Sequence, residues 1–294
     1  MAHETKATGF HANGDGEPDE ARSSLVTIQP GAGAQAALFC VHAEAGDVSL
    51  YEGLARHLAS EQRVFGLCAP SAAEFEALDS LEQLAARHVR EIRAVQADGP
   101  YLIVGECTGG ALAYEMAQQL RAADQEVALL ALIDAFPTGA PPLASHMPKP
   151  AYRILHRARI LGFHVGNLLR LGLAEKLAYL RSKGARARAA LKAKVARLFG
   201  DTPVSASQQL AFRRALAAYE AKPYAGSAVV FRARRLSLGI EASQSSRDLG
   251  WGRLVEDVQV EMLPGYFTTP ISEPGVRVLA DRLSQRLRDC AQAA

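Results

Sequence analysis

The chain alternates between short apolar runs and stretches in which apolar residues recur with helical spacing. Apolar runs with the length of buried strands lie at 36–42, 63–68, 101–105 and 126–134. Segments with helical spacing follow them at 48–58, at 81–96 and after Gly110. Strands and helices that alternate at these lengths predict an α/β fold with a mostly parallel sheet covered by helices on both faces.

This pattern stops near residue 138 and resumes after about residue 218, with further apolar runs at 226–232 and 258–263 and an amphipathic helix over 275–290. We therefore predict a core formed by residues 26–137 and 219–294, split by a helical lid insertion over 138–218. Residues 1–25 have almost no apolar periodicity, which is typical of a disordered tail or linker.

The insertion is strongly basic, because residues 151–198 contain twelve Lys or Arg and a single acidic residue, Glu175. Two interpretations are open for this segment. It is either a solvated helix pair or a docking surface for an acidic or phosphorylated partner.

The tripeptide Asp-Ser-Leu at 79–81 has the residues of a phosphopantetheine attachment site. Ser80, however, directly precedes the helix predicted over 81–96, and Gln83 is placed to complete a capping box. We therefore predict that Ser80 is an N-cap.

Composition narrows the range of functions. A chain of 294 residues suits one large α/β domain or a domain with an insertion, and a net charge of +2 gives no overall case for nucleic-acid binding. No apolar run approaches ~20 residues, so no membrane span is expected, and the N-terminus lacks a secretion signal. The chain has four cysteines, Cys40, Cys68, Cys107 and Cys290. They are too few and too scattered for a disulfide framework, and no pair has the spacing of metal ligands. This predicts reduced thiols, no metal site and a cytoplasmic location.

Residues 101–117 have the pattern of a nucleophile elbow, in which a strand turns sharply into a helix. Gly105 and Gly109 flank the turn, where a Cβ atom would clash. The pattern expects serine at its centre, and Cys107 stands there. The N-terminus of the following helix is expected to lower the pKa of Cys107 by favouring its thiolate. The alternative is a buried, structural cysteine in a glycine-rich turn.

Seven stretches in order, including this elbow, resemble the thioesterase domains of polyketide synthases and nonribosomal peptide synthetases, which have the α/β-hydrolase fold. They are 38–42, 99–105 with the elbow, 114–120, 129–134, 219–224, 248–252 and Glu273-Pro274. The resemblance implies an enzyme of antibiotic or related biosynthesis that cleaves acyl groups from the phosphopantetheine of an acyl or peptidyl carrier protein. It implies no bound cofactor.

The resemblance also implies roles for individual residues. Cys107 matches the nucleophile, and Asp134 matches the carboxylate that orients a histidine. The backbone N–H groups of Ala43 and Thr108 would form the oxyanion hole. His42, at a strand end, is expected to be structural rather than catalytic.

The histidine that serves these enzymes as general base is missing from this chain. In the family it lies in a C-terminal loop of the type Pro-Gly-Xaa-His-aromatic, and counting back from Glu273-Pro274 places Phe267 at its position. The last histidine of the chain is His164. The alternative is a base supplied by the insertion, from His146, His156 or His164.

The loss of the histidine affects two half-reactions differently. Acyl exchange between thiols is close to isoenergetic, whereas release to water needs a base that typically contributes ~10²–10⁴-fold. We therefore expect Cys107 to accept acyl chains and hydrolysis to be impaired, which favours acyl transfer, condensation or cyclisation.

Two other functions stay open at this point. The protein is then either a binding protein for acylated carriers, or an enzyme that runs an elimination or rearrangement with Glu44, Asp47 or Glu106, assisted by Tyr266. The same three carboxylates are otherwise ordinary surface charges.

Overall fold

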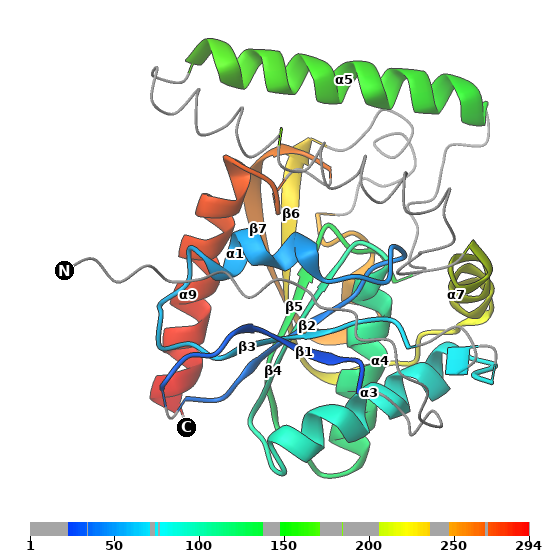
Figure 1. The fold of residues 1–294 in the computed structure, drawn as a ribbon, viewed down its shortest axis with the longest axis vertical. Coiled ribbons are helices and arrows are strands. Elements are labelled where there is room, and N and C mark those ends of the chain that lie inside the picture. The colour runs from blue at the N-terminus through cyan, green and yellow to red at the C-terminus, as the bar shows by residue number, and fades with distance from the viewer. Residues whose placement is uncertain are drawn as a thin grey trace, which may run out of the picture.

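The computed structural model describes residues 23–33, 35–70, 74–75, 77–137, 148–170, 184, 206–235, 247–267 and 270–293. These residues form a seven-stranded sheet in the order β1-β3-β2-β4-β5-β6-β7, in which β1 is antiparallel to β3 and the other pairs are parallel (Figure 1). The predicted α/β-hydrolase architecture is confirmed. The strands are β1 (Leu25–Gln29), β2 (Leu38–Val41), β3 (Val64–Leu67), β4 (Tyr101–Glu106), β5 (Val127–Ile133), β6 (Tyr224–Arg235) and β7 (Val255–Tyr266).

Two apolar layers cover the sheet, because successive residues of each strand point to opposite faces. Ile103 of β4 belongs to the layer under α3 and α4, while Leu102 and Val104 belong to the layer under α1 and α9. The helical segments are η1 (Ser49–Tyr51), α1 (Glu52–Ala55), α3 (Leu81–Val95), α4 (Gly109–Ala122), α5 (Lys149–Arg170), α7 (Ala206–Ala218), η2 (Trp251–Arg253) and α9 (Gly275–Ala293).

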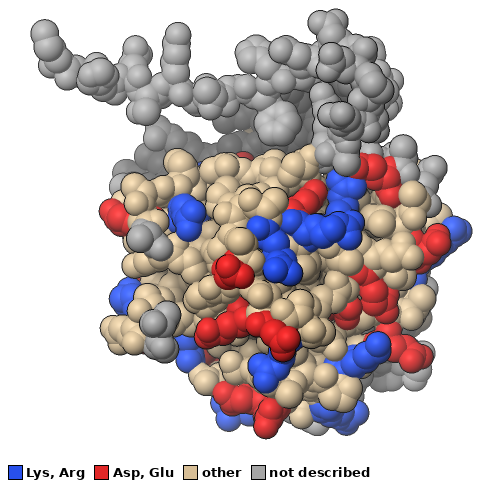
Figure 2. Space-filling model, turned by 90° about the horizontal axis from the view of Figure 1, so that it is seen from below, with Lys and Arg blue, Asp and Glu red and all other residues tan. Residues whose placement is uncertain are grey.

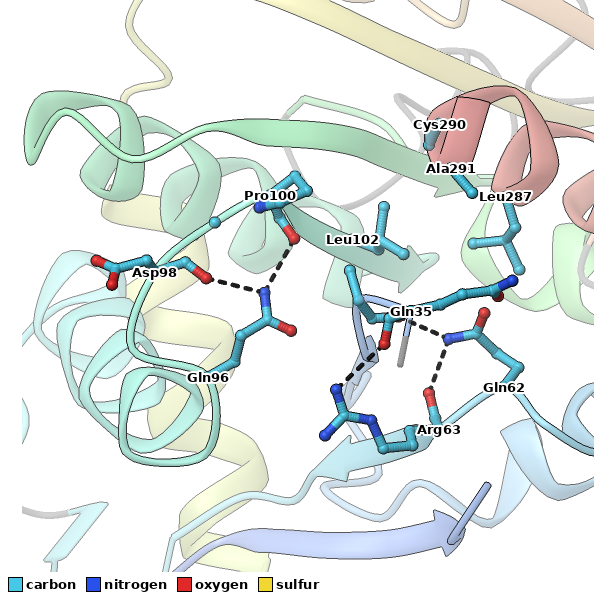
Figure 3. A pocket seen from close by; sticks show the side chains of 12 residues that line it. Gln35, Gln62, Arg63, Gln96, Asp98, Pro100, Leu102, Leu287, Cys290 and Ala291 are labelled. Carbon is cyan, nitrogen blue, oxygen red and sulfur yellow. Dashed lines mark hydrogen bonds between the residues drawn. The ribbon is translucent and has the colours of Figure 1, made fainter. Parts of the chain in front are cut away.

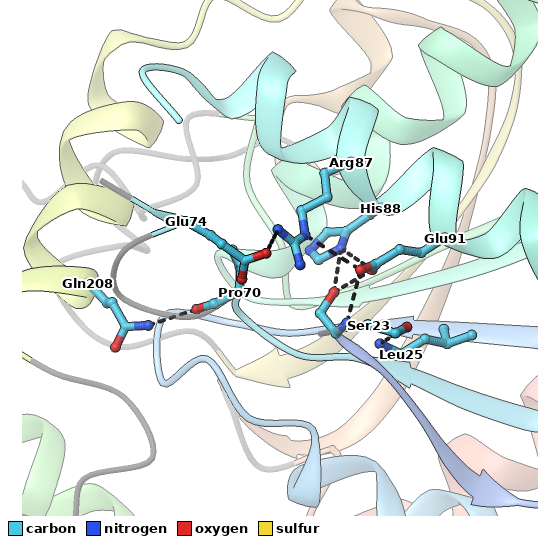
Figure 4. Close-up of polar contacts among 9 residues, drawn as sticks. Ser23, Leu25, Pro70, Glu74, Arg87, His88, Glu91 and Gln208 are labelled. Atoms are coloured by element: carbon cyan, nitrogen blue, oxygen red, sulfur yellow. Dashed lines mark hydrogen bonds and ion pairs between the residues drawn. The ribbon is translucent and has the colours of Figure 1, made fainter. Parts of the chain in front are cut away.

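The edge strand β1 was missed by the sequence analysis, since its half-buried residues show no clear alternation. Its start is held by Ser24, whose amide donates to Glu91 Oε1 at 2.9 Å and whose hydroxyl donates to Oε2. Figure 4 shows Glu91 beside His88 and Arg87 on α3. Of the tail predicted over 1–25, residues 1–22 lie outside the described residues.

The predicted N-cap is confirmed. The amide of Gln83 donates to Ser80 Oγ at 3.3 Å, and Gln83 Oε1 accepts from the amide of Asp79 rather than from that of Ser80. Ser80 therefore contributes to the stability of α3.

Of the predicted lid, α5 and α7 are described, and most of 171–205 and all of 138–147 lie outside the described residues. Figure 1 shows α5 above the carboxyl ends of β6 and β7. On the opposite side of the molecule, seen from below in Figure 2, basic and acidic side chains are interspersed. Across the described residues, no helix is both long and apolar enough to span a membrane.

Candidate functional site

Cys107 lies at the apex of a tight turn between β4 and α4. Its φ of 51° is in the left-handed region, which is costly for a residue with a Cβ atom. A Cβ atom on Gly105 would approach Gly109 O to 2.5 Å, and one on Gly109 would approach His42 O to 2.6 Å. Glycine at both positions therefore permits the turn and brings the start of α4 against the loop after β2.

Asp134 lies at the end of the strand next to Cys107. The amide of Cys107 continues the β4–β5 pairing by donating to Ile133 O at 2.9 Å, and Asp134 follows directly. Asp134 is fully buried with a φ of 46°, and its Oδ1 accepts from the amide of Ala233 at 2.7 Å. Trp251 fixes the next residue, since its Nε1 donates to Ala135 O at 2.9 Å. The structure thus brings Cys107 and Asp134 together at the carboxyl edge of the sheet.

The two expected oxyanion-hole residues also lie together at this edge. The amide of Ala43 donates to no other described residue, and the amide of Thr108 is directed at the Cys107 thiol. Thr108 Oγ1 accepts from the amide of Glu44 at 2.9 Å, which ties the elbow to the loop after β2. The amide of Thr108 therefore lies beside the sulfur, and the hydrogen bond between Glu44 and Thr108 brings the loop that carries Ala43 against the elbow.

Phe267, at the expected histidine position, is part of the core. Its amide donates to Arg235 O at 2.9 Å, and its side chain is 4% exposed. The ring packs against Phe136, two residues after Asp134, with centroids 5.8 Å apart. The loop after β7 therefore reaches across the end of β6 to the neighbourhood of Asp134, but it delivers an apolar ring there.

The environment of Cys107 reverses one expectation. Burial first, then the neighbouring Glu106, raises the pKa of the Cys107 thiol, and the amide of Thr108 offsets only part of this effect. The expectation of a pKa lowered by the N-terminus of α4 is therefore wrong, and Cys107 is a neutral thiol near pH 7. Burial and low exposure could not be inferred from the elbow pattern.

The same buried environment also changes the pKa of the Glu106 carboxyl, next to Cys107 in the chain. Its side chain is 8% exposed, and burial, followed by the charge of Asp134, raises its pKa to about 8. Its amide donates to the hydroxyl of Tyr51, which in turn donates to Val41 O. Glu106 is thus held next to Cys107 in a state that exchanges a proton near neutral pH.

Two of the other auxiliary residues, Asp47 and Tyr266, have hydrogen-bond partners of their own. Asp47 accepts from the amide and the hydroxyl of Ser49 and so holds the turn before η1. Tyr266 accepts from Arg235 Nη1 at 3.0 Å. Asp47 and Tyr266 therefore have structural partners rather than a shared proton.

Glu44 is held by α7, a helix of the segment predicted to be a lid. Arg213 of α7 forms an ion pair with Glu44, and Gln208 of the same helix donates to Pro70 O at 2.7 Å (Figure 4). Phe212 of α7 packs against His42 with centroids 5.3 Å apart. Sequence patterns gave no signal for these contacts, because they join residues more than a hundred positions apart.

His42 is buried, with Nδ1 2.8 Å from Ala43 O and a pKa lowered to about 3, chiefly by burial. It is therefore neutral at physiological pH and shapes the loop that carries Ala43. Of the lid histidines, His146 lies outside the described residues, and the side chains of His156 and His164 do as well. The described residues contain no group of three or more potential metal ligands.

Comparison with known proteins agrees with this geometry. Residues 36–286 match the family model "Thioesterase domain". The chain is 35% identical over 124 residues to a dimodular nonribosomal peptide synthase of Bacillus subtilis (strain 168), and 36% identical over 123 residues to microperfuranone synthase of Emericella nidulans. These matches cover 41% and 40% of the chain but only 5% and 13% of the two relatives.

Solved structures show the same fold at low identity. The NocB thioesterase domain superposes with a TM-score of 0.57 at 23% identity, covering 90% of this chain and 99% of that domain. A four-domain nonribosomal peptide synthetase, holo-AB3403, gives a TM-score of 0.62 at 23% identity, covering 90% of this chain and 20% of that one. The family match over residues 36–286 shows that the chain belongs to the thioesterase-domain family.

Proposed function

We propose that the protein takes acyl groups from the phosphopantetheine thiol of an acyl or peptidyl carrier protein onto Cys107. It then passes them to a nucleophile other than freely activated water, by acyl transfer, condensation or cyclisation. One observation carries this proposal: Cys107 stands at the apex of the elbow beside the amide of Thr108, while the buried Phe267 stands at the position expected for the histidine. This arrangement supports acyl capture and argues against a base for water at position 267.

In the capture step, the Cys107 sulfur attacks the thioester carbonyl carbon, and the oxyanion is held by the amides of Ala43 and Thr108. The carbon–sulfur bond to phosphopantetheine then breaks, and the released thiolate takes a proton. The exchange replaces one thioester by another, so its equilibrium constant is close to one.

Glu106 is the group we assign to the proton. Because Cys107 is a neutral thiol, capture needs an acceptor for its proton, and Glu106 becomes ionised as pH rises through about 8. The same carboxyl, once protonated, returns the proton to the leaving thiol. Acyl capture is therefore expected to increase from pH 7 to pH 9.

The carrier protein is expected to dock on α5. This helix has Lys149 and Arg170 at its ends and no acidic residue between them. It also exposes apolar side chains on one side, with Ile154 and Leu169 68% and 78% exposed. A basic and apolar surface suits a partner that is acidic and partly apolar, so binding should weaken with salt. An affinity independent of salt removes this role.

Intact-protein mass spectrometry after mixing with a carrier that bears an octanoyl thioester tests the proposal. An octanoyl adduct is expected on the native protein and not on Cys107→Ala. Cys68→Ala is the matched control and should keep the adduct, since Cys68 is a half-buried thiol away from the elbow. The proposal fails if the adduct is absent from the native protein or survives in Cys107→Ala.

Two further functions have specific observations in their favour. The raised pKa of Cys107 favours a protein that binds acylated carriers without chemistry, which predicts carrier binding with no adduct. The pKa of Glu106 near 8 favours a proton-transfer reaction, such as elimination or rearrangement. In that case turnover survives in Cys107→Ala and is lost in Glu106→Gln. Glu44→Gln should have little effect, because Glu44 is paired with Arg213.

A cytoplasmic location also belongs to this proposal. It agrees with the four cysteines, which are free thiols in the described residues.

A further inference from the structure

A cavity of about 470 Å³ lies at the amino ends of the strands, on the edge of the sheet opposite to Cys107 (Figure 3). Leu102 of β4 lines it, and Cys107 lies five residues further along the chain. At about 3.3 Å per residue, the cavity and the elbow are roughly 16 Å apart. No residue of the acyl-capture site lines this cavity, so it is a separate site.

One wall of the cavity is apolar. Leu102 and the last turns of α9, with Leu287 and Ala291, form it. Cys290 belongs to the same wall, with its thiol donating to Ala128 O at 3.3 Å. Burial raises the pKa of Cys290, so the thiol is neutral and behaves as a small apolar group. This wall suits an aliphatic chain or a ring.

The opposite wall is polar and fixed in orientation. Gln62 is 3% exposed, and its Nε2 donates to Ala36 O at 2.9 Å and to Arg63 O at 3.1 Å (Figure 3). Both amide hydrogens are thus used, while no described residue donates to Gln62 Oε1. Gln96 is saturated, because its Nε2 donates to two carbonyls and its Oε1 accepts from Ala37. Gln62 therefore offers one acceptor for a donor of a ligand.

Arg63 supplies a positive charge at the same wall. Its Nη2 donates to Gln35 O at 3.1 Å, and Figure 3 shows its guanidinium beside Gln35 at the edge of the cavity. Asp98 also lines the cavity, on the side of Gln96 (Figure 3), and within the described ranges no carboxylate forms an ion pair with Arg63. A guanidinium is well suited to a carboxylate, which it can bind through two parallel hydrogen bonds.

We propose that this cavity binds a medium-chain organic acid, whose carboxylate pairs with Arg63 and whose chain lies against Leu102, Leu287 and Cys290. A hydroxyl or amide N–H near the carboxylate donates to Gln62. A volume of about 470 Å³ is within the range of small-molecule sites. Binding in this cavity is independent of acyl capture at Cys107.

The native cysteines allow a direct test with 3-hydroxyoctanoate as the probe, using N-ethylmaleimide alkylation resolved by peptide mass spectrometry. Saturating probe is expected to slow alkylation of Cys290 at least fivefold and to leave Cys68 unchanged as an internal reference. 1-Octanol, which lacks the charge, should protect only at much higher concentration. Equal alkylation of Cys290 with and without the probe overturns the proposal.

Two variants separate charge from shape. Arg63→Gln should weaken protection by 3-hydroxyoctanoate roughly tenfold or more, the typical effect of a charged hydrogen bond, and leave 1-octanol unaffected. Ala291→Trp, which fills the cavity from the exposed end of α9, should weaken both. Both variants should keep native acyl capture at Cys107. An unchanged affinity for 3-hydroxyoctanoate in folded Arg63→Gln also overturns the proposal.

Discussion

Replacing Phe267 by histidine restores the residue type that the family uses to activate water. The loop after β7 already brings position 267 to Phe136, close to the buried Asp134. A general base there should raise hydrolysis by ~10²–10⁴-fold, which corresponds to about 3–5 kcal/mol of barrier. Because only the neutral imidazole accepts a proton from water, hydrolysis by the variant should rise with pH as the new histidine loses its proton.

The substitution also has a structural cost. Phe267 is 4% exposed, so histidine places ring nitrogens in a site built for an apolar ring. We expect a loss of about 1–3 kcal/mol in the free energy of unfolding, the usual cost of a buried polar group without a full set of partners. Urea denaturation measures this loss, and circular dichroism verifies that the variant is folded.

The assay is hydrolysis of octanoyl-N-acetylcysteamine, followed by release of the free thiol and by the octanoate formed. Phe267→Gln controls for polarity without a base, and Tyr266→His places the same ring on the neighbouring residue, whose hydroxyl meets Arg235. Neither control should hydrolyse faster than the native protein. The reasoning is refuted if folded Phe267→His hydrolyses at the native rate, or if its hydrolysis persists when Cys107 is also changed to alanine.

Four further predictions concern single residues. Glu106→Gln should remove a pH dependence of the free energy of unfolding. The pKa of the Glu106 carboxyl rises from 4.5 to about 8 on folding, so the protonated carboxyl stabilises the fold at low pH. This contribution, up to about 4–5 kcal/mol, is lost as pH rises from 4.5 to 8. Urea denaturation of both proteins at pH 5 and pH 8.5 measures it, and equal pH dependence contradicts it. At pH 9, where Glu106 is ionised, the same variant should speed alkylation of Cys107 by iodoacetamide, because a neighbouring charge that raises the thiol pKa is gone, yet slow acyl capture; a parallel change in both rates removes Glu106 from the proton transfer. Trp251→Phe should cost about 1–3 kcal/mol, since Ala135 O then lacks its donor inside the core, and an unchanged denaturation midpoint would argue against this. Ser80→Ala should cost about 1 kcal/mol by thermal denaturation, with Ser60→Ala, an exposed serine outside any helix cap, as the neutral control.

Local sequence signals predicted the elements that frame the site. The elbow could be predicted from Gly105 and Gly109 on either side of Cys107, because the steric limits of a tight turn depend on adjacent residues. The place of Asp134 at the end of a buried strand followed from the apolar run before it, and the cap role of Ser80 followed from its position before a predicted helix. These inferences hold because the interactions concerned lie within a few residues of one another.

The features that the sequence analysis did not predict depend on contacts between residues far apart in the chain. The strand β1 depends on Glu91, sixty-seven positions after Ser24, and the place of Glu44 depends on Arg213 in the lid. The pKa of Cys107 was predicted in the wrong direction because it depends on burial, which only the folded sheet and lid determine. A single sequence contains no local pattern for such couplings.

The contact between Phe267 and Phe136 has a consequence for engineering the site. The ring of Phe267 belongs to the core and packs against Phe136, so position 267 contributes to the fold as well as to the site. A substitution that introduces a base there therefore meets a penalty in stability before any gain in activity. Selection of this chain for hydrolysis should accordingly require compensating changes elsewhere in the core.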